Sequence, residues 1–164
     1  MKKIVLACSM LLFVSLTFAQ TEKKNGTIYI NHPYIDVVNK ATKAYIANDL
    51  KTWKSLFEDS AKFSISGMDK SLNLKDNLDA LTLDHKFFDN ITVKTIGYPD
   101  YLHYDKDDSK VVQSWWKWSG KSKKTGKVLS LYFVQFDDFN NAGKIIKESI
   151  LGDFSKQFAE EGVQ

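Results

Sequence analysis

The feature that most constrains the fold is a change of hydrophobic period at Asn90. Beyond it, apolar and polar side chains alternate with a period of two, as in β-strands, and short polar turns separate the runs. The runs span residues 91–96 and 101–104, which a bend at Gly97 and Pro99 separates, then 111–119, 128–136 and 144–154. Because short connections join only antiparallel neighbours, this half of the chain predicts a continuous antiparallel sheet.

Before Asn90, apolar residues recur mostly at helical spacing. Three helices are expected, over residues 33–47, 50–57 and 75–88, with a short strand over 61–66. The third helix has one apolar stripe, formed by Leu74, Leu78, Leu81, His85 and Phe88. Helices segregated from a long antiparallel sheet indicate an α+β domain, in which the sheet curls around the helices to cover their apolar faces.

The first residues have the three-part pattern of a cleavable secretory signal. Met1-Lys2-Lys3 is basic, residues 4–19 carry no charge, and Thr17-Phe18-Ala19 supplies small residues before a cleavage point. A retained anchor would need about 20 apolar residues, and a lipoprotein signal at Cys8 would leave an apolar region too short for export. We therefore expect an exported protein, periplasmic or secreted. Its parts are a signal peptide (1–19), a leader (20–31), one domain (32–158) and a tail (159–164).

The amino-acid composition limits the classes of partner that are expected. Lys and Arg together number 23, and every one is a lysine. Nucleic-acid and phosphate recognition usually depends on the planar guanidinium of arginine, so no nucleic-acid partner is expected. Loss of the signal would remove Cys8, the only cysteine, and with it any disulfide and any reason for membrane association. The sequence holds no phosphate loop, nucleophile motif or metal-spaced His/Cys set, so we expect no cofactor and no metal.

The order of elements resembles the nuclear-transport-factor-2-like superfamily, in particular its SnoaL-like (polyketide cyclase-like) branch. Three local stretches carry the resemblance: residues 48–59 with Trp53, residues 116–127 with Trp116-Lys117-Trp118-Ser119-Gly120, and Gly143-Lys144-Ile145 with Asp153. The resemblance implies a cone-shaped antiparallel sheet wrapped around three N-terminal helices, with an apolar pocket at the open end. Members include isomerases, cyclases, dehydratases, epoxide hydrolases and non-catalytic binding modules, so the fold does not choose the function.

Three residues are candidates for acid–base chemistry. His85 lies on the apolar stripe and could act on a pocket-bound ligand, or it could be a core histidine bonded to backbone. Asp153 would share a strand face with Ile145, and the resemblance puts the matching aspartate near the pocket; it could equally be an exposed strand-end carboxylate. Tyr101 could polarise a ligand oxygen. We predict that His85 and Asp153 meet at the open end of the cone, unless a one-residue slip turns Asp153 outward.

Five further residues are candidates for ligand binding: Trp53, His103, Gln113, Trp115 and Lys117. His103 lies two residues from Tyr101 on one strand, so both project together, either toward a ligand oxygen or at a sheet margin. Gln113, Trp115 and Lys117 share one strand face, and Trp116 and Trp118 share the other. The tryptophans could build an aromatic pocket wall or pack on both faces of the sheet, and the pattern does not decide which face lines the pocket.

The sequence thus predicts an exported, cofactor-free protein that holds a small, partly apolar molecule. If it is an enzyme, which stays open at this level, proton transfer in an isomerisation, dehydration or cyclisation is expected. The alternative is a non-catalytic binding or interaction module whose cone is filled by its own side chains. Pocket volume discriminates between the two.

A homodimer through the sheet is also expected. The strand over 128–136 is apolar on both faces, whereas a sheet with one covered face should alternate apolar and polar residues. A symmetric second copy would cover the outer face, as the resemblance also implies. The rival explanation is coverage by residues 27–30 or by the C-terminal tail.

Overall fold

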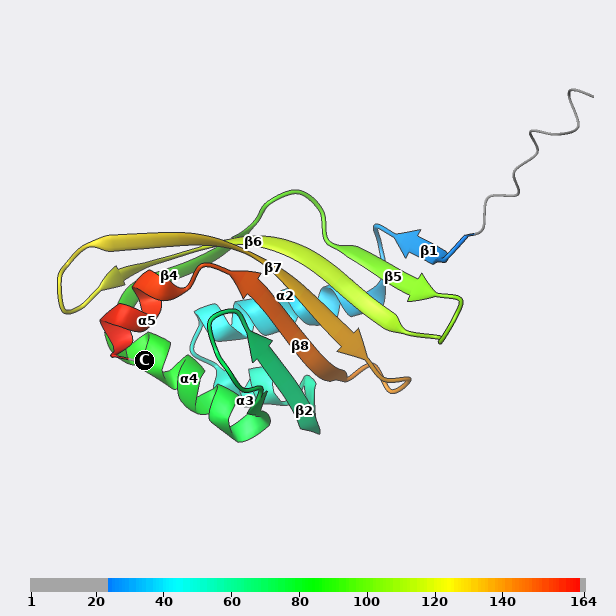
Figure 1. The fold of residues 1–164 in the computed structure, drawn as a ribbon, viewed down its shortest axis with the longest axis horizontal. Helices are drawn as coiled ribbons and strands as arrows, with labels where there is room; N and C mark the ends of the chain where they lie inside the picture. Colours follow the sequence, from blue (N-terminus) through cyan, green and yellow to red (C-terminus); the bar gives the residue numbers. More distant parts are fainter. Residues whose placement is uncertain (1–23, 163–164) are drawn as a thin grey trace, which may run out of the picture.

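The computed structural model describes residues 24–162, which form a mixed α+β fold (Figure 1). The expected signal peptide, residues 1–19, and Cys8 within it lie outside the described residues. An open, curved, eight-stranded sheet is accompanied by four helices in the described part of the chain. The α+β class and the curved, mostly antiparallel sheet are therefore confirmed.

The first three of these helices begin at polar caps. The helices are α2 (Pro33–Ile46), α3 (Leu50–Lys54), α4 (Leu74–Phe87) and α5 (Ser155–Glu161). The side chains of Asp49 and Asn73 accept hydrogen bonds from backbone amides in the first turns of α3 and α4, at 3.0 and 2.9 Å. The expectation of three N-terminal helices was incomplete, because α5 follows the last strand and packs against α4. None of the helices within residues 24–162 combines the length and the apolar character that crossing a membrane requires.

The sheet has the strand order β1-β5-β6-β7-β8-β2-β3, and β4 pairs with β6. Its strands are β1 (Gly26–Tyr29), β2 (Phe57–Ile65), β3 (Leu72–Asn73), β4 (Phe88–Thr95), β5 (Asp100–Tyr104), β6 (Lys110–Ser122), β7 (Val128–Phe139) and β8 (Ile145–Gly152). The β2–β8 pair is parallel and the other described pairs are antiparallel. Helices α2, α3 and α4 lie along one side of this sheet (Figure 1).

Both ends of the described chain belong to the folded unit. Strand β1 falls in the expected leader and pairs with β5, with Tyr29 opposite Tyr101. It therefore extends the edge of the sheet rather than covering its outer face. Helix α5 overlaps the expected tail, and Glu160 accepts a hydrogen bond from the Ser122 hydroxyl at 2.7 Å. This bond ties α5 to the end of β6.

A bulge in β8 decides which of its side chains face the helices. Asp138 pairs with Lys147 but Phe139 pairs with Ile145, so Ile146 is an extra residue in the strand. Because of it, Ile145 and Glu148 both face inward and are buried, although they are three residues apart.

The inner face of β6 carries buried side chains in strict alternation, from Val112 through Ser114 and Trp116 to Trp118. The intervening residues Gln113, Trp115 and Lys117 are only partly buried and point to the outer face. The burial pattern therefore identifies the inner and the outer face of β6.

Candidate functional site

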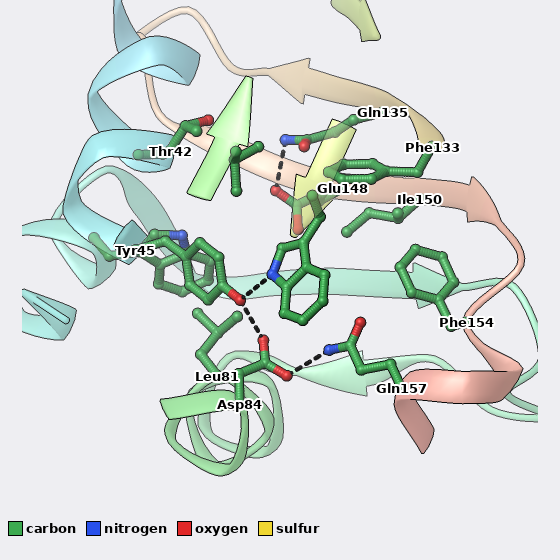
Figure 2. A pocket seen from close by; sticks show the side chains of 14 residues that line it. Thr42, Tyr45, Leu81, Asp84, Phe133, Gln135, Glu148, Ile150, Phe154 and Gln157 are labelled. Carbon is green, nitrogen blue, oxygen red and sulfur yellow. Dashed lines mark hydrogen bonds between the residues drawn. The ribbon is translucent and has the colours of Figure 1, made fainter. Parts of the chain in front are cut away.

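A cavity of about 110 Å³ lies between the helices and the inner face of the sheet (Figure 2). Five aromatic side chains line it: Tyr45, Trp53, Trp118, Phe133 and Phe154. Its polar lining consists of Thr42, Asp84, Gln135, Glu148 and Gln157, and its aliphatic lining of Ala41, Leu81, Val93 and Ile150. A second cavity of about 110 Å³ shares Leu81, Asp84, Glu148, Ile150, Phe154 and Gln157 with the first. Residues of α4, β8 and the α5 region therefore separate two adjoining spaces.

A chain of hydrogen bonds connects the sheet, α2, α4 and α5 at the cavity. The Trp118 indole N–H donates to the Tyr45 hydroxyl at 2.9 Å, and this hydroxyl donates to Asp84 Oδ2 at 2.7 Å (Figure 2). The Gln157 amide donates to Asp84 Oδ1 at 2.6 Å. Each oxygen of this buried carboxyl group has a partner, as burial of a polar group requires.

Asp84 also shares a hydrogen bond with the carboxyl group of Glu161 on α5. Burial raises the pKa of Asp84, and burial together with this bond raises the pKa of Glu161 to about 8. The pair therefore retains a proton at neutral pH. Burial and the negative charge of Asp84 raise the pKa of Tyr45 well above its usual range, so its hydroxyl stays protonated.

A second carboxyl pair lies on the sheet. Gln135 Nε2 donates to Asp137 Oδ1 and Oδ2 at 3.1 and 2.9 Å and to Glu148 Oε2 at 3.0 Å. Burial raises the pKa of Asp137 to about 7. Burial and the adjacent Asp137 raise the pKa of Glu148 well above its usual range, and the two carboxyl groups share a hydrogen bond. Glu148 is thus a protonated acid at the cavity wall, with Asp137 behind it.

No salt bridge in residues 24–162 involves either carboxyl pair. A buried carboxyl group without a cation keeps its proton, whereas one beside a lysine would ionise. Glu148 therefore keeps its proton at the cavity wall.

The structure does not bring His85 and Asp153 together, so their predicted meeting was wrong. His85 Nε2 lies 2.8 Å from the backbone carbonyl oxygen of Tyr45; because a carbonyl only accepts, the proton belongs on Nε2. The backbone bond of the core-histidine interpretation is therefore present, although His85 is only partly buried. Asp153 follows the end of β8 and is exposed, and its carboxylate accepts from the backbone amide of Ser155 at 3.1 Å. Neither side chain lines the cavity.

Tyr101 and His103 also lie elsewhere. Tyr101 stacks on His32 with ring centroids 3.7 Å apart, next to β1 and the start of α2. His103 Nε2 lies 2.5 Å from Asp108 Oδ1 at the following turn. These two residues belong to an aromatic cluster that does not line the cavity.

The remaining candidates divide by sheet face. Gln113, Trp115 and Lys117 were placed at the ligand, but they point to the outer face of β6, away from the cavity. Trp118, on the opposite face, lines it. Trp53 on α3 is buried and also lines it, and contact between Trp53 and a ligand stays a prediction.

Comparison with known proteins identifies the fold. No protein-family model and no curated protein matches the chain. Among solved structures, IdmH, a proposed polyketide cyclase from Streptomyces antibioticus, is 17% identical with a TM-score of 0.63 over 80% of this chain and 100% of its own. An NTF2-like protein of unknown function from an Exiguobacterium species is 19% identical, with a TM-score of 0.57 over 71% of this chain and 98% of its own. This chain has the nuclear-transport-factor-2-like fold.

A third protein with this NTF2-like fold is a hypothetical protein from Catenulispora acidiphila, described as ketosteroid isomerase-like and solved in complex with trimethylamine. It is 12% identical, with a TM-score of 0.60 over 79% of this chain and 94% of its own. At such identities the likeness extends to the NTF2-like fold and not to activity. The resemblance expected from the sequence is confirmed at the level of the fold.

Proposed function

We propose that this protein binds a small, partly apolar molecule in the cavity and exchanges protons with it through Glu148 and Asp137. The observation that carries the proposal is the buried carboxyl group of Glu148 at the wall of a cavity with five aromatic side chains. Isomerisation, dehydration and cyclisation all need such a proton donor and acceptor, and one placed side chain contributes about 10²–10⁴-fold to the rate.

In this proposal Glu148 is the general acid and base, because it reaches the cavity. Asp137 and Gln135 orient its carboxyl group through their hydrogen bonds. Asp84 is fixed by Tyr45 and Gln157 on the helical side of the cavity. These residues replace His85, Asp153 and Tyr101 in the roles first predicted.

The fold relatives support a small ligand. They include the proposed cyclase IdmH and AclR, a proposed hydroxylase from Streptomyces galilaeus. The Catenulispora protein holds trimethylamine. A small molecule in the pocket of this chain is consistent with all three.

One observation favours the alternative, a non-catalytic module. The cavity volume of about 110 Å³ is below the roughly 300 Å³ at which pockets for drug-sized ligands begin. Side chains from α5 fill part of the space between helices and sheet. A protein that binds no ligand larger than a few non-hydrogen atoms could act instead through its outer sheet face.

Proton exchange on a small ketone tests the proposal. We would incubate the mature protein with 2-butanone in deuterated water and follow loss of the α-protons by NMR. Wild-type protein should accelerate the exchange, and Glu148→Gln should slow it by 10²-fold or more, because the amide cannot donate and recover a proton. Asp79→Asn, at an exposed carboxylate of α4, should leave the rate unchanged. If the wild type binds 2-butanone without accelerating exchange of its α-protons, the non-catalytic alternative is favoured. Mass spectrometry of molecules that co-purify with the protein would identify the natural ligand.

We also propose that the protein is exported after cleavage near Gln20. The basic start and uncharged stretch of the sequence support this. N-terminal sequencing of protein from its native host should begin near Gln20, and an intact Met1-Lys2-Lys3 would contradict it.

We further propose a homodimer through the outer face of β6, β7 and β8. Large apolar side chains are exposed there, with Val128 at 67%, Tyr132 at 62% and Leu151 at 54%. Light scattering at micromolar concentration should give twice the mature mass, and Tyr132→Glu should give a monomer. Tyr98→Glu is the matched control, because Tyr98 is 82% exposed but lies in the loop between β4 and β5.

A further inference from the structure

We infer that the ligand of this cavity is a small organic cation, an alkylammonium group held between the aromatic walls and the carboxyl groups of Asp84 and Glu148. The inference rests on the proposed function, since it names the ligand class of the same cavity. Four observations carry it. The ionisable side chains at the wall are acidic, the wall is rich in aromatic rings, the cavity volume is small, and the buried carboxyl groups hold protons that a cation can displace.

Two side chains at the cavity wall, Asp84 and Glu148, can ionise near neutral pH, and both are acidic. Asp84 reaches it from α4 and Glu148 from β8, while Asp137 on β7 and Glu161 on α5 stand behind them. The lining contributed by α2, α3, β4 and β6 is neutral, and among the described residues no Lys or His lines this cavity. The nearest base along α4, His85, is bonded to the Tyr45 carbonyl oxygen. An anion would meet only carboxyl groups here, whereas a cation would meet two carboxyl groups that become negatively charged when they release a proton.

The aromatic side chains supply what an organic cation needs besides charge. Alkylammonium groups bind against the faces of Trp, Tyr and Phe rings, because the ring face carries partial negative charge, and the contact strengthens when water is excluded. Figure 2 shows the rings of Tyr45, Phe133 and Phe154 around the space, with Asp84 on the helical side and Glu148 on the sheet side. Trp53 and Trp118 complete the aromatic set.

The volume limits the size of the cation. A water molecule takes about 30 Å³ in the liquid, so a cavity of about 110 Å³ holds roughly four groups of that size. A trimethylammonium or tetramethylammonium group has about this bulk.

The carboxyl groups would respond to such a ligand by releasing a proton. In the free protein both pairs retain protons, because burial raises the pKa of Asp84 and of Glu148 and none of the salt bridges within residues 24–162 involves them. A cation in the cavity favours the ionised form. Binding is therefore coupled to proton release, and its affinity should rise with pH by up to about tenfold per unit.

Calorimetric titration with tetramethylammonium and with tert-butyl alcohol tests the inference, because the two have similar size and shape but differ in charge. The mature protein should bind tetramethylammonium at least tenfold more tightly than tert-butyl alcohol at pH 7.5. The affinity for the cation should increase from pH 6 to pH 8, and the binding heat should depend on the ionisation heat of the buffer. The alcohol should show neither effect.

Substitutions test whether the carboxyl groups of Glu148 and Asp84 bind the cation. Glu148→Gln and Asp84→Asn should each weaken tetramethylammonium binding by tenfold or more and leave the alcohol unaffected. Asp79→Asn should bind like wild type. Circular dichroism shows whether Asp84→Asn folds. If it does not, Glu148→Gln and the comparison of the two ligands on the wild type still test whether the cavity prefers a cation.

The outcomes separate this inference from the proposed function. Tighter or equal binding of tert-butyl alcohol, without pH dependence, would overturn the cation and leave the apolar pocket standing. Binding of neither probe at millimolar concentration would overturn both and favour the filled cone.

Discussion

Replacing Asp137 by asparagine should flatten the pH dependence of the stability of this protein. Asp137 has no exposed surface, and burial raises its pKa from 3.8 to about 7. A group whose folded-state pKa is raised stabilises the fold fully below its unfolded pKa, and this contribution is lost as pH rises through the folded pKa. Between pH 3.8 and about 7 the unfolded chain has released a proton that the folded protein retains. The free energy of unfolding should therefore fall with rising pH.

The magnitude follows from one retained proton, which corresponds to about 1.4 kcal/mol per pH unit. From pH 5 to pH 7, where the folded carboxyl group becomes half ionised, the contribution of Asp137 declines by about 2 kcal/mol. Asparagine keeps the volume and one acceptor for Gln135 Nε2 but removes the ionisable group. The decline in the variant should be smaller by that amount.

Urea unfolding followed by tryptophan fluorescence at pH 5, 6 and 7 measures this directly. Asp79→Asn is the control and should keep the wild-type slope, since its carboxylate is exposed and paired with Lys75. Parallel pH dependences for wild type and Asp137→Asn would refute the argument that this carboxyl group folds protonated.

Two further substitutions and one truncation probe the site and its surroundings. Trp118→Phe removes the N–H donor to Tyr45 and should lower the free energy of unfolding by about 1–3 kcal/mol in urea titration, because a buried hydroxyl loses a partner. Gly120→Ala should cost about 1–3 kcal/mol, since the new Cβ would lie 2.6 Å from the Trp118 ring; an unchanged midpoint would mean that the ring moves freely. Ending the chain after Gly152 removes Phe154 and Gln157 and should raise the fluorescence of an added hydrophobic dye, because the cavity loses its α5 wall.

The fold could be predicted because hydrophobic period reports on which residues are covered. The change of period at Asn90 located the sheet, and α4 was expected at residues 75–88 and occupies Leu74–Phe87. The inward face of α4 was placed less well. Of the predicted stripe, Leu74 is buried and Leu78 packs against the core. The structure buries Asn77 and Asp84 as well, which the sequence did not indicate. Hydrophobic pattern cannot reveal a buried polar stripe.

Asp84 is buried because partners far away in the sequence satisfy it. Tyr45 on α2 and Gln157 on α5 bond its two oxygens. No local signal near Asp84 announces either partner, and no helix was expected after the last strand. The residue next to it, His85, drew the prediction because histidine is the commoner acid–base residue.

Glu148 was missed for a different reason, the bulge in β8. Regular alternation from Ile145 places Lys147 inward and Glu148 outward, and it aligns Asp153 with Ile145. The extra residue Ile146 reverses this beyond the bulge, so Glu148 faces the cavity. Bulges leave no dependable mark in hydrophobic pattern, and here both neighbours of the bulged position are ordinary strand residues.

The same bulge affects how relatives of this chain can be matched to it. A relative that lacks a residue equivalent to Ile146 could keep both Ile145 and Glu148 facing inward, because its strand would alternate regularly between them. An alignment that runs without a gap from Ile145 would then place its acid opposite Lys147 instead of Glu148. Two chains with the same carboxyl group in the same place would seem to differ in it. A search for the equivalent of Glu148 in other chains should therefore allow a gap of one residue within β8.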